Sequence, residues 1–161
     1  ANIIKNTQKP TIAWIRGMAC SAGYWIASSS DEIFASTEND EVGSIGVQFS
    51  FADMQPVWEK QGVKFHRITA DQSSEKNKIF FEAQKGDYKG IKNDVLNPIA
   101  EVFINTIKQN RKNITSQMLT GKVFFAKNVL GSLVDSIGDF DHAVSRALEL
   151  HKPTVKTIKF I

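Results

Sequence analysis

The chain has 161 residues, 42% of them hydrophobic, so it is long enough to form one domain with a buried core. Its 20 Lys and Arg residues exceed its 17 Asp and Glu residues by a net charge of only +3, and they are dispersed, which argues against nucleic acid as a partner. A single cysteine excludes an intrachain disulfide and a cysteine-based zinc cluster. No apolar run approaches the roughly 20 residues that cross a membrane. We expect a cytoplasmic protein, with membrane or virion association as the alternative for the full-length protein.

The first half of the chain carries the patterns of an α/β domain. We predict short buried strands at 11–15, 31–36 and 44–49, which are brief apolar runs bounded by polar or small residues. Apolar residues at helical spacing predict an amphipathic helix over 51–61, and Gly62 is placed to end it.

The segments that follow alternate between strand, loop and helix patterns. The alternating run 63–68 predicts a strand, and the polar segment 71–77 predicts a loop. Apolar helices are expected within 79–111, with Asn97-Pro98 as an N-cap and first-turn pair. Their stripe and nearby phenylalanines favour core or subunit contacts over a cofactor site; the stripe comprises Ile99, Val102, Phe103, Thr106 and Ile107.

Toward its end the chain predicts one more helix. Residues 140–150 have an apolar face, and the tail 152–161 is either an edge strand or a continuation of the fold. The densest basic group, Lys108, Arg111 and Lys112, is expected to be a solvated helix face.

One serine lies in a cluster of small residues directly after the first predicted strand. Ser21 follows Ala19-Cys20, precedes Ala22-Gly23, and is succeeded by an apolar run typical of a helix. A strand-to-helix turn of small residues can hold a hydroxyl at a helix N-terminus, where backbone N–H groups and the helix dipole favour developing negative charge. The Gly-x-Ser-x-Gly pattern is absent, so these residues alone leave both a nucleophile and ordinary tight packing open.

A second motif, Gly43-Ser44-Ile45-Gly46-Val47, follows about twenty residues later. Together with Lys9–Ala13, Ala19–Tyr24 and Asp31–Ala35, it resembles the signal peptide peptidase A family, and the resemblance continues through Leu133–Gly138. The similarity covers roughly residues 9–148 and is nearest to the branch of phage capsid (prohead) proteases. It implies an α/β, crotonase/Clp-protease-like fold of repeated ββα units, here truncated at its N-terminus, as a single domain over 1–161.

The resemblance also implies a catalytic site built on a Ser–Lys dyad. Ser21 would be the nucleophile, Lys76 the base with Lys78 as its alternative, Ser44 the group that orients the lysine, and the Ala22 N–H an oxyanion donor. A lysine can act as a base when its surroundings lower its pKa from about 10.4. No metal or cofactor is needed for this chemistry.

Two kinds of rival nucleophile or base are weaker candidates. The sequence ties none of the histidines (His66, His142 and His151) to Ser21, and a surface or packing role is expected for each. Cys20 lies next to Ser21, and we expect a buried structural thiol pointing away from it.

The resemblance further implies a polypeptide substrate, a homo-oligomer, and capsid or scaffold proteins as possible partners. The family's glycine-rich oxyanion loop has no counterpart before Gly17, so we expect the chain to be a fragment or a processed product. Two alternatives stay open. One is a non-catalytic oligomeric shell or scaffold subunit, and the other is an acyl-coenzyme A enzyme of the crotonase type.

Overall fold

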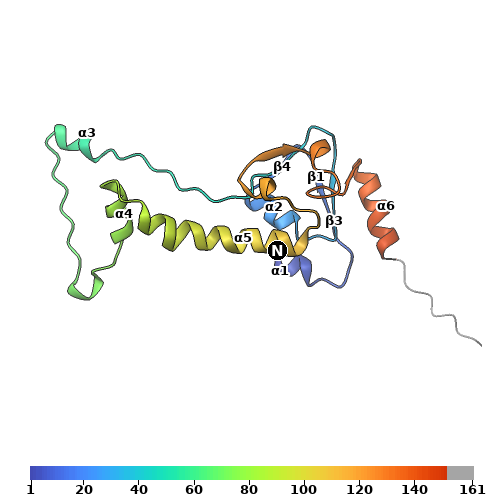
Figure 1. Ribbon diagram of the computed structural model, residues 1–161, viewed down its shortest axis with the longest axis horizontal. Coiled ribbons are helices and arrows are strands. Elements are labelled where there is room, and N and C mark those ends of the chain that lie inside the picture. Colours follow the sequence, from blue (N-terminus) through green and yellow to red (C-terminus); the bar gives the residue numbers. More distant parts are fainter. Residues whose placement is uncertain (152–161) are drawn as a thin grey trace, which may run out of the picture. The chain divides into compact units, whose positions relative to one another are not determined.

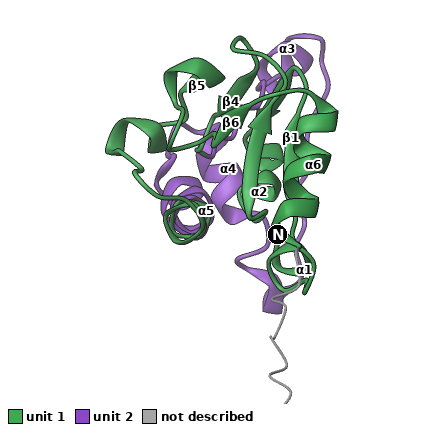
Figure 2. Cartoon of the chain, turned by 90° about the vertical axis from the view of Figure 1, so that its right-hand side faces the viewer, with its two compact units in different colours: residues 1–46, 103–161 green, residues 47–102 purple. Residues whose placement is uncertain are grey.

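The computed structural model describes residues 1–151 of the chain, which divide into two compact units. Unit 1 contains Ala1–Gly46 and the chain from Phe103 onward, and unit 2 contains Val47–Val102 (Figure 2). The expectation of a strand or continuation at 152–161 lies outside the described residues. The expectation of one domain over 1–161 stays a prediction.

Unit 1 is built around two small sheets. The first contains β1 (Ile12–Ile15), β3 (Glu32–Ala35) and β6 (Ser136–Ile137), all parallel, with β3 in the centre. The second has the order β2-β4-β5: β2 (Met18–Cys20) is parallel to β4 (Glu41–Gly43), which is antiparallel to β5 (Val123–Phe125). The first four strands alternate between the two sheets, and β4 and β5 both belong to the second. Because β2 and β4 are parallel neighbours, they end at the same edge although β3 separates them in sequence.

Helices contribute side chains to the apolar core of unit 1. Figure 1 labels the helices and strands. Helix α2 (Ala22–Ala27) contributes Tyr24 and Ala27, and the C-terminal part of α5 (Asn97–Asn110) contributes Phe103 and Ile107. Trp25 stacks on Phe103 with ring centroids 4.4 Å apart. The remaining elements are α1 (Asn2–Lys5), η3 (Ser116–Leu119), η4 (Ala126–Asn128) and α6 (Phe140–Leu150).

Helix α6 is fastened to the first sheet by capping, aromatic and ionic contacts. The Asp139 side chain accepts the His142 backbone N–H at 2.8 Å, which caps the helix. Trp14 of β1 meets Phe140 edge-on with centroids 5.4 Å apart, and Arg146 binds both carboxylate oxygens of Glu32 on β3. The predicted helix at 140–150 is confirmed.

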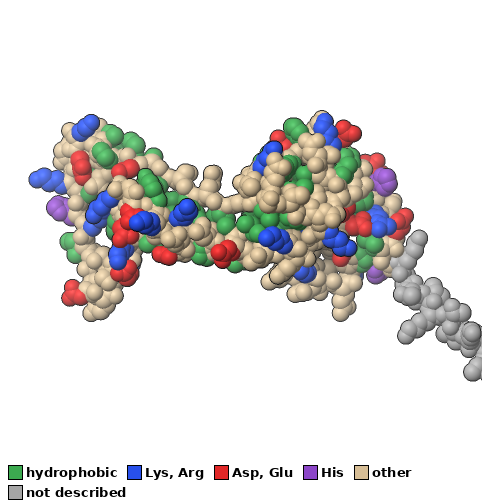
Figure 3. All heavy atoms as spheres, viewed as in Figure 1, with side chains coloured by type: hydrophobic (Ala, Val, Ile, Leu, Met, Phe, Trp, Pro, Cys, Tyr) green, Lys and Arg blue, Asp and Glu red, His purple; other side chains and the backbone are tan. Residues whose placement is uncertain are grey.

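Unit 2 is mainly helical and has few buried apolar residues. Its elements are α3 (Gln55–Lys60), η1 (Asp71–Ser73), α4 (Lys78–Gln84) and the π-helical segment η2 (Ile91–Leu96), which runs directly into α5. Within this unit the buried apolar residues are Ala83 and Ile91. Apolar side chains, drawn green, lie among Lys and Arg on the face of this unit seen in Figure 3.

Several sequence predictions agree with the structure. The strands expected at 11–15 and 31–36 are β1 and β3, and Gly62 follows α3 with a φ of +85°, as a helix-ending glycine should. The helices expected within 79–111 are α4, η2 and α5.

Other predictions are wrong in their boundaries or type. The strand expected at 44–49 lies instead at 41–43, because Gly43 (φ +100°) and Ser44 (φ +51°) turn the chain out of the sheet. Within the described residues, 63–68 pairs with no strand and α3 is shorter than 51–61. Asn97 is not an N-cap, because its φ of −62° and ψ of −47° continue the helix from η2.

Candidate active site

Ser21 stands at the junction of β2 and α2. The sequence predicted a strand-to-helix turn here, but with the strand at 11–15 and without β2. Ser21 is exposed, and as the N-cap of α2 it has a φ of 52° and a ψ of −123°. This conformation is sparsely populated by residues with a side chain and costs on the order of 1–3 kcal/mol, so the surrounding structure must hold it. Its amide donates to the Gly43 carbonyl at 2.8 Å, and its carbonyl accepts the Trp25 N–H at 3.0 Å.

Ser44 lies beside Ser21 at the edge of the second sheet. Cys20 and Gly43 are register partners in the parallel pair β2–β4, and the next residue of each strand is one of the two serines. Both serines leave their strands with positive φ, and the Ser44 amide donates to the Lys122 carbonyl at 2.9 Å. The structure therefore brings together the two serines that the motifs singled out.

The glycines of the second motif permit a close approach of another segment. A Cβ on Gly43 would lie 3.0 Å from the Lys122 carbonyl oxygen and 3.2 Å from the Phe124 ring. A Cβ on Gly46 would lie 3.0 Å from the Cα of Gly121. Since real Cβ atoms rarely tolerate such distances, glycine at both positions lets 121–124 pack against the serine edge.

Ala22 is the first residue of α2 and carries a backbone N–H beside Ser21. The first amides of a helix have no intrahelical acceptor, so this N–H is available to a group at the helix end. Ala22 and Gly23 are both exposed, which leaves the approach to this end of the helix open in unit 1.

Lys76 and Lys78 belong to unit 2, whereas Ser21, Ala22 and Ser44 belong to unit 1. Lys76 is exposed in the turn after η1, where its amide donates to the Ser73 carbonyl at 3.0 Å. Among the described residues, its side chain has no hydrogen-bond or ion-pair partner. The pairing of Lys76 with Ser21 stays a prediction.

Lys78, the alternative base, has an acidic partner. Its Nζ lies 3.1 Å from the Glu75 carboxylate, and the hydrogen bond and the negative charge of Glu75 raise the pKa of Lys78. A raised pKa keeps the ammonium protonated and works against a role as base. The structure thus distinguishes the two lysines by their electrostatic surroundings.

The rival groups have ordinary structural surroundings. Cys20 is half-buried, and burial, followed by the charge of Glu41, raises the pKa of its thiol, which disfavours the reactive thiolate. His142 is exposed and meets Phe34 edge-on, and His66 and His151 are also exposed. Within residues 1–151 no group of three or more His, Cys, Asp or Glu residues is placed to hold a metal ion.

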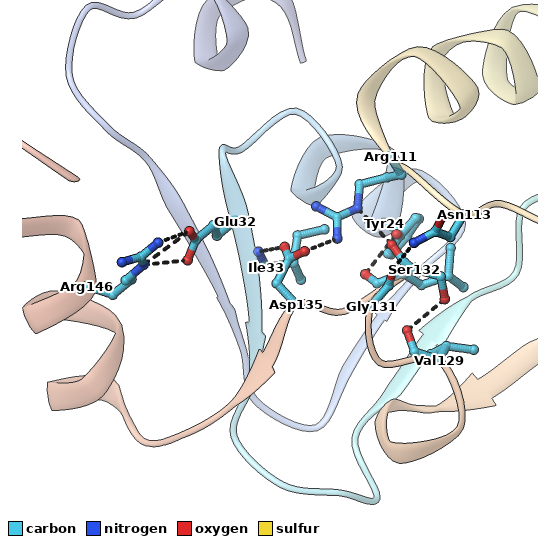
Figure 4. Close-up of polar contacts among 11 residues, drawn as sticks. Tyr24, Glu32, Ile33, Arg111, Asn113, Val129, Gly131, Ser132, Asp135 and Arg146 are labelled. Atoms are coloured by element: carbon cyan, nitrogen blue, oxygen red, sulfur yellow. Dashed lines mark hydrogen bonds and ion pairs between the residues drawn. The ribbon is translucent and has the colours of Figure 1, made fainter. Parts of the chain in front are cut away.

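Sequence reasoning missed a buried polar network behind α2. Arg111 was expected on a solvated helix face, but it is buried and its Nη2 lies 2.7 Å from Asp135 Oδ1 (Figure 4). The same figure shows Tyr24 near this pair. The sequence offered two separate signals: Arg111 at the end of an apolar helix, and Asp135 directly after Leu133-Val134. A single sequence does not show that these two residues pair.

An exposed serine with a positive φ at a strand-to-helix junction resembles the turn that presents a serine in a nucleophile elbow. The chain belongs to peptidase family S49, whose family model matches residues 3–154. In the part that the structure describes, no helix is long and apolar enough to span a membrane.

Three curated proteins illustrate the relationship. "Protease 4" of Haemophilus influenzae is 28% identical over 146 residues, which is 88% of this chain and 23% of that protein. A "Putative signal peptide peptidase SppA" of Enterococcus faecium is 26% identical over 159 residues, 96% of this chain and 46% of that protein. "Protease 4" of Salmonella typhi is 28% identical over 148 residues, which is 89% of this chain and 24% of that protein. The chain thus spans less than half the length of these relatives.

Proposed function

We propose that the protein is a serine endopeptidase that works through a Ser–Lys dyad. Ser21 attacks the scissile carbonyl while Lys76 accepts its proton. The ammonium of Lys76 then gives this proton to the leaving amine as the C–N bond breaks, which yields the acyl-enzyme and a neutral lysine. Water, deprotonated by the same lysine, then hydrolyses the ester and releases Ser21. Ser44 orients Lys76, and the Ala22 N–H donates to the developing oxyanion.

The conformation of Ser21 is the observation that carries this proposal. A serine that served only packing could be replaced by glycine, which adopts a positive φ without steric cost. Instead, an exposed hydroxyl is held in a strained turn at a helix N-terminus, in a chain of a peptidase family. Strain at an exposed polar residue is typical of a site where geometry matters more than stability.

Lys76 is the better candidate for the base because Lys78 is bound to Glu75. A general base must be neutral for part of the time near the working pH, and a carboxylate partner opposes neutrality. Lys76 lines a cavity of about 280 Å³ within unit 2, whose other charged lining residues are Arg67, Lys78, Lys85 and Glu82.

For the fold, we propose the crotonase/Clp-protease type. Three successive pairs of strands each supply one strand to each sheet: α2 follows β1 and β2, and α6 follows β5 and β6. After β3 and β4, the helical elements of unit 2 come before α5. This succession supports the repeated ββα units expected from the sequence.

A homo-oligomer is part of the proposal. In unit 2, large apolar side chains such as Met54, Trp58 and Ile99 are between 44% and 49% exposed, and such surfaces favour association. Light scattering on the purified protein tests this, and a monomer at micromolar concentration would contradict it.

The direct experiment is labelling with a fluorophosphonate, followed by mass spectrometry of the modified peptide. We expect one adduct, on Ser21, and none on the Ser21→Ala variant. Ser145→Ala, which removes an exposed serine of α6, should label like the parent. No adduct on Ser21 would contradict the proposal and favour a non-catalytic shell subunit or an acyl-coenzyme A enzyme. The resemblance to prohead proteases makes capsid and scaffold polypeptides the first substrates to test.

A further inference from the structure

Helix α2, which carries Ser21 at its N-terminus, is too short to fix its own orientation. It has six residues, and an isolated helix of this length is unstable in water. Its position therefore depends on the residues that anchor it to the rest of unit 1. Ala22, Gly23 and Ile26 are exposed, whereas Tyr24 is completely buried, so the helix has one face that holds it in place.

Tyr24 makes the polar contact of that face. Its hydroxyl donates to the Leu133 carbonyl at 2.9 Å in a buried environment. Leu133 belongs to the turn 129–135, in which its own amide donates to the Val129 carbonyl at 3.0 Å. The hydroxyl of Tyr24 thus joins α2 to a specific backbone atom of an ordered turn.

The turn that receives Tyr24 is itself held by a buried ion pair. Arg111 donates from Nε to the Ser132 carbonyl at 3.0 Å and from Nη2 to Asp135 at 2.7 Å. The other carboxylate oxygen of Asp135 accepts the Ile33 N–H of β3 at 2.7 Å. Figure 4 shows these contacts converging on the turn from the end of α5 and from β3. A shift of the Leu133 carbonyl would break contacts on both sides, so the acceptor of Tyr24 is rigidly placed.

We propose that Tyr24 is a positioning residue for the nucleophile. Arg111 and Asp135 hold in place the Leu133 carbonyl that accepts the Tyr24 hydrogen bond. Ser21 and Tyr24 are one helical turn apart, and the Ser21 carbonyl accepts the first backbone hydrogen bond of that turn. Rotation of α2 about its axis would therefore move the Ser21 hydroxyl away from its reactive position. The inference rests on the proposed function, since it assigns a role to Tyr24 only if Ser21 attacks the substrate.

The test compares Tyr24→Phe with the parent protein in peptide hydrolysis and in the rate of fluorophosphonate labelling. The substitution removes the hydroxyl and keeps the ring. We expect kcat and the labelling rate to fall about 10- to 100-fold, the range produced by small misplacements of reacting groups, with KM within about twofold. Asp135→Asn, which weakens the support of the turn and leaves Tyr24 intact, should also lower kcat with little change in KM, and it serves if Tyr24→Phe does not fold.

Arg146→Gln is the control. It removes the ion pair between α6 and Glu32 of β3 and leaves the turn 129–135 intact, so it should lose stability and keep kcat. A folded Tyr24→Phe variant with the parental kcat would overturn the inference, as would equal losses of kcat in Tyr24→Phe and Arg146→Gln. Activity retained by Ser21→Ala would instead refute the proposed function, which separates the two failures.

Discussion

The backbone amide of Ser21 donates a hydrogen bond of 2.8 Å to the carbonyl of Gly43. This bond joins the two motifs that are separated by about twenty residues in the sequence. Because β2 and β4 are parallel neighbours, the motifs end at one edge of one sheet, and the strand between them in sequence belongs to the other sheet. A change in the backbone at Gly43 is therefore transmitted to Ser21 through a single hydrogen bond.

Gly43→Ala should destabilise the protein by about 2 kcal/mol or more and reduce peptide hydrolysis. The new methyl group would lie 3.0 Å from the Lys122 carbonyl oxygen at a φ of +100°, so both contact and conformation oppose it. Urea unfolding and a peptide assay on the folded variant measure the two effects. Gly131→Ala is the control, because Gly131 also has a positive φ but open space around it. Equal destabilisation by both variants would contradict the role given to the close approach.

Lys76→Met should abolish peptide hydrolysis, whereas Lys78→Met should leave most of it. In the parent, activity should rise with pH, because the neutral amine is the form that accepts a proton. The measurement is a profile of kcat/KM against pH for the three proteins. The reverse pattern would transfer the role of base to Lys78, and full activity in both variants would exclude a base in this segment.

Ser44→Ala should lower activity less than Ser21→Ala, because it removes an orienting hydrogen bond worth about 1 kcal/mol and no reacting group. Since Ser44 has a φ of +51°, alanine would also be strained there. Ser44→Gly removes the hydroxyl without that strain, and it should match or exceed Ser44→Ala in stability while showing a similar loss of activity. A loss as complete as that of Ser21→Ala in both folded variants would mean that Ser44 takes part in the chemistry directly.

Asp40 makes stability depend on pH in the acid range. Burial by itself raises the pKa of Asp40, but hydrogen bonds from Ser36, Thr37 and Gly17 outweigh it and lower the pKa below the ordinary value. Because the pKa is lower in the folded state, the stabilisation is complete above the unfolded pKa of about 3.9 and is lost as pH falls through the folded value.

Asp40→Asn should therefore cost about 1–3 kcal/mol at pH 7 and progressively less below pH 4. Urea unfolding of the two proteins at pH 7, 4 and 3 gives this difference directly. Asp94→Asn, which changes an exposed carboxylate, should show little effect at any of these values. A penalty for Asp40→Asn that is constant with pH would contradict the assignment.

The elements that could be predicted from the sequence are those with a pattern in their own residues. The prediction failed for elements that form only through contacts with residues distant in the sequence. The strands at 11–15 and 31–36 are apolar runs long enough to stand out, and α6 carries both its cap and an apolar face. Strands β2 and β5 have three residues each, which is too short for any periodicity to show. The run 63–68 has a strand pattern, but a strand requires a partner, which a local pattern does not reveal.

The site could be predicted in part for the same reason. Ser21 and Ser44 lie in motifs of small residues, so the sequence singled them out, and their adjacency follows from the register of β2 and β4. The role of Arg111 was missed because its partner Asp135 is distant in sequence and only tertiary structure buries the pair.

The central claim is that the strained conformation of Ser21 is kept for its hydroxyl. The most direct test is a joint measurement of stability and peptide hydrolysis for Ser21→Gly. Glycine adopts a φ of 52° without steric cost, so the variant should be at least as stable as the parent to urea and should show no hydrolysis above background. A folded Ser21→Gly protein that still hydrolyses peptides at the parental rate would contradict the account.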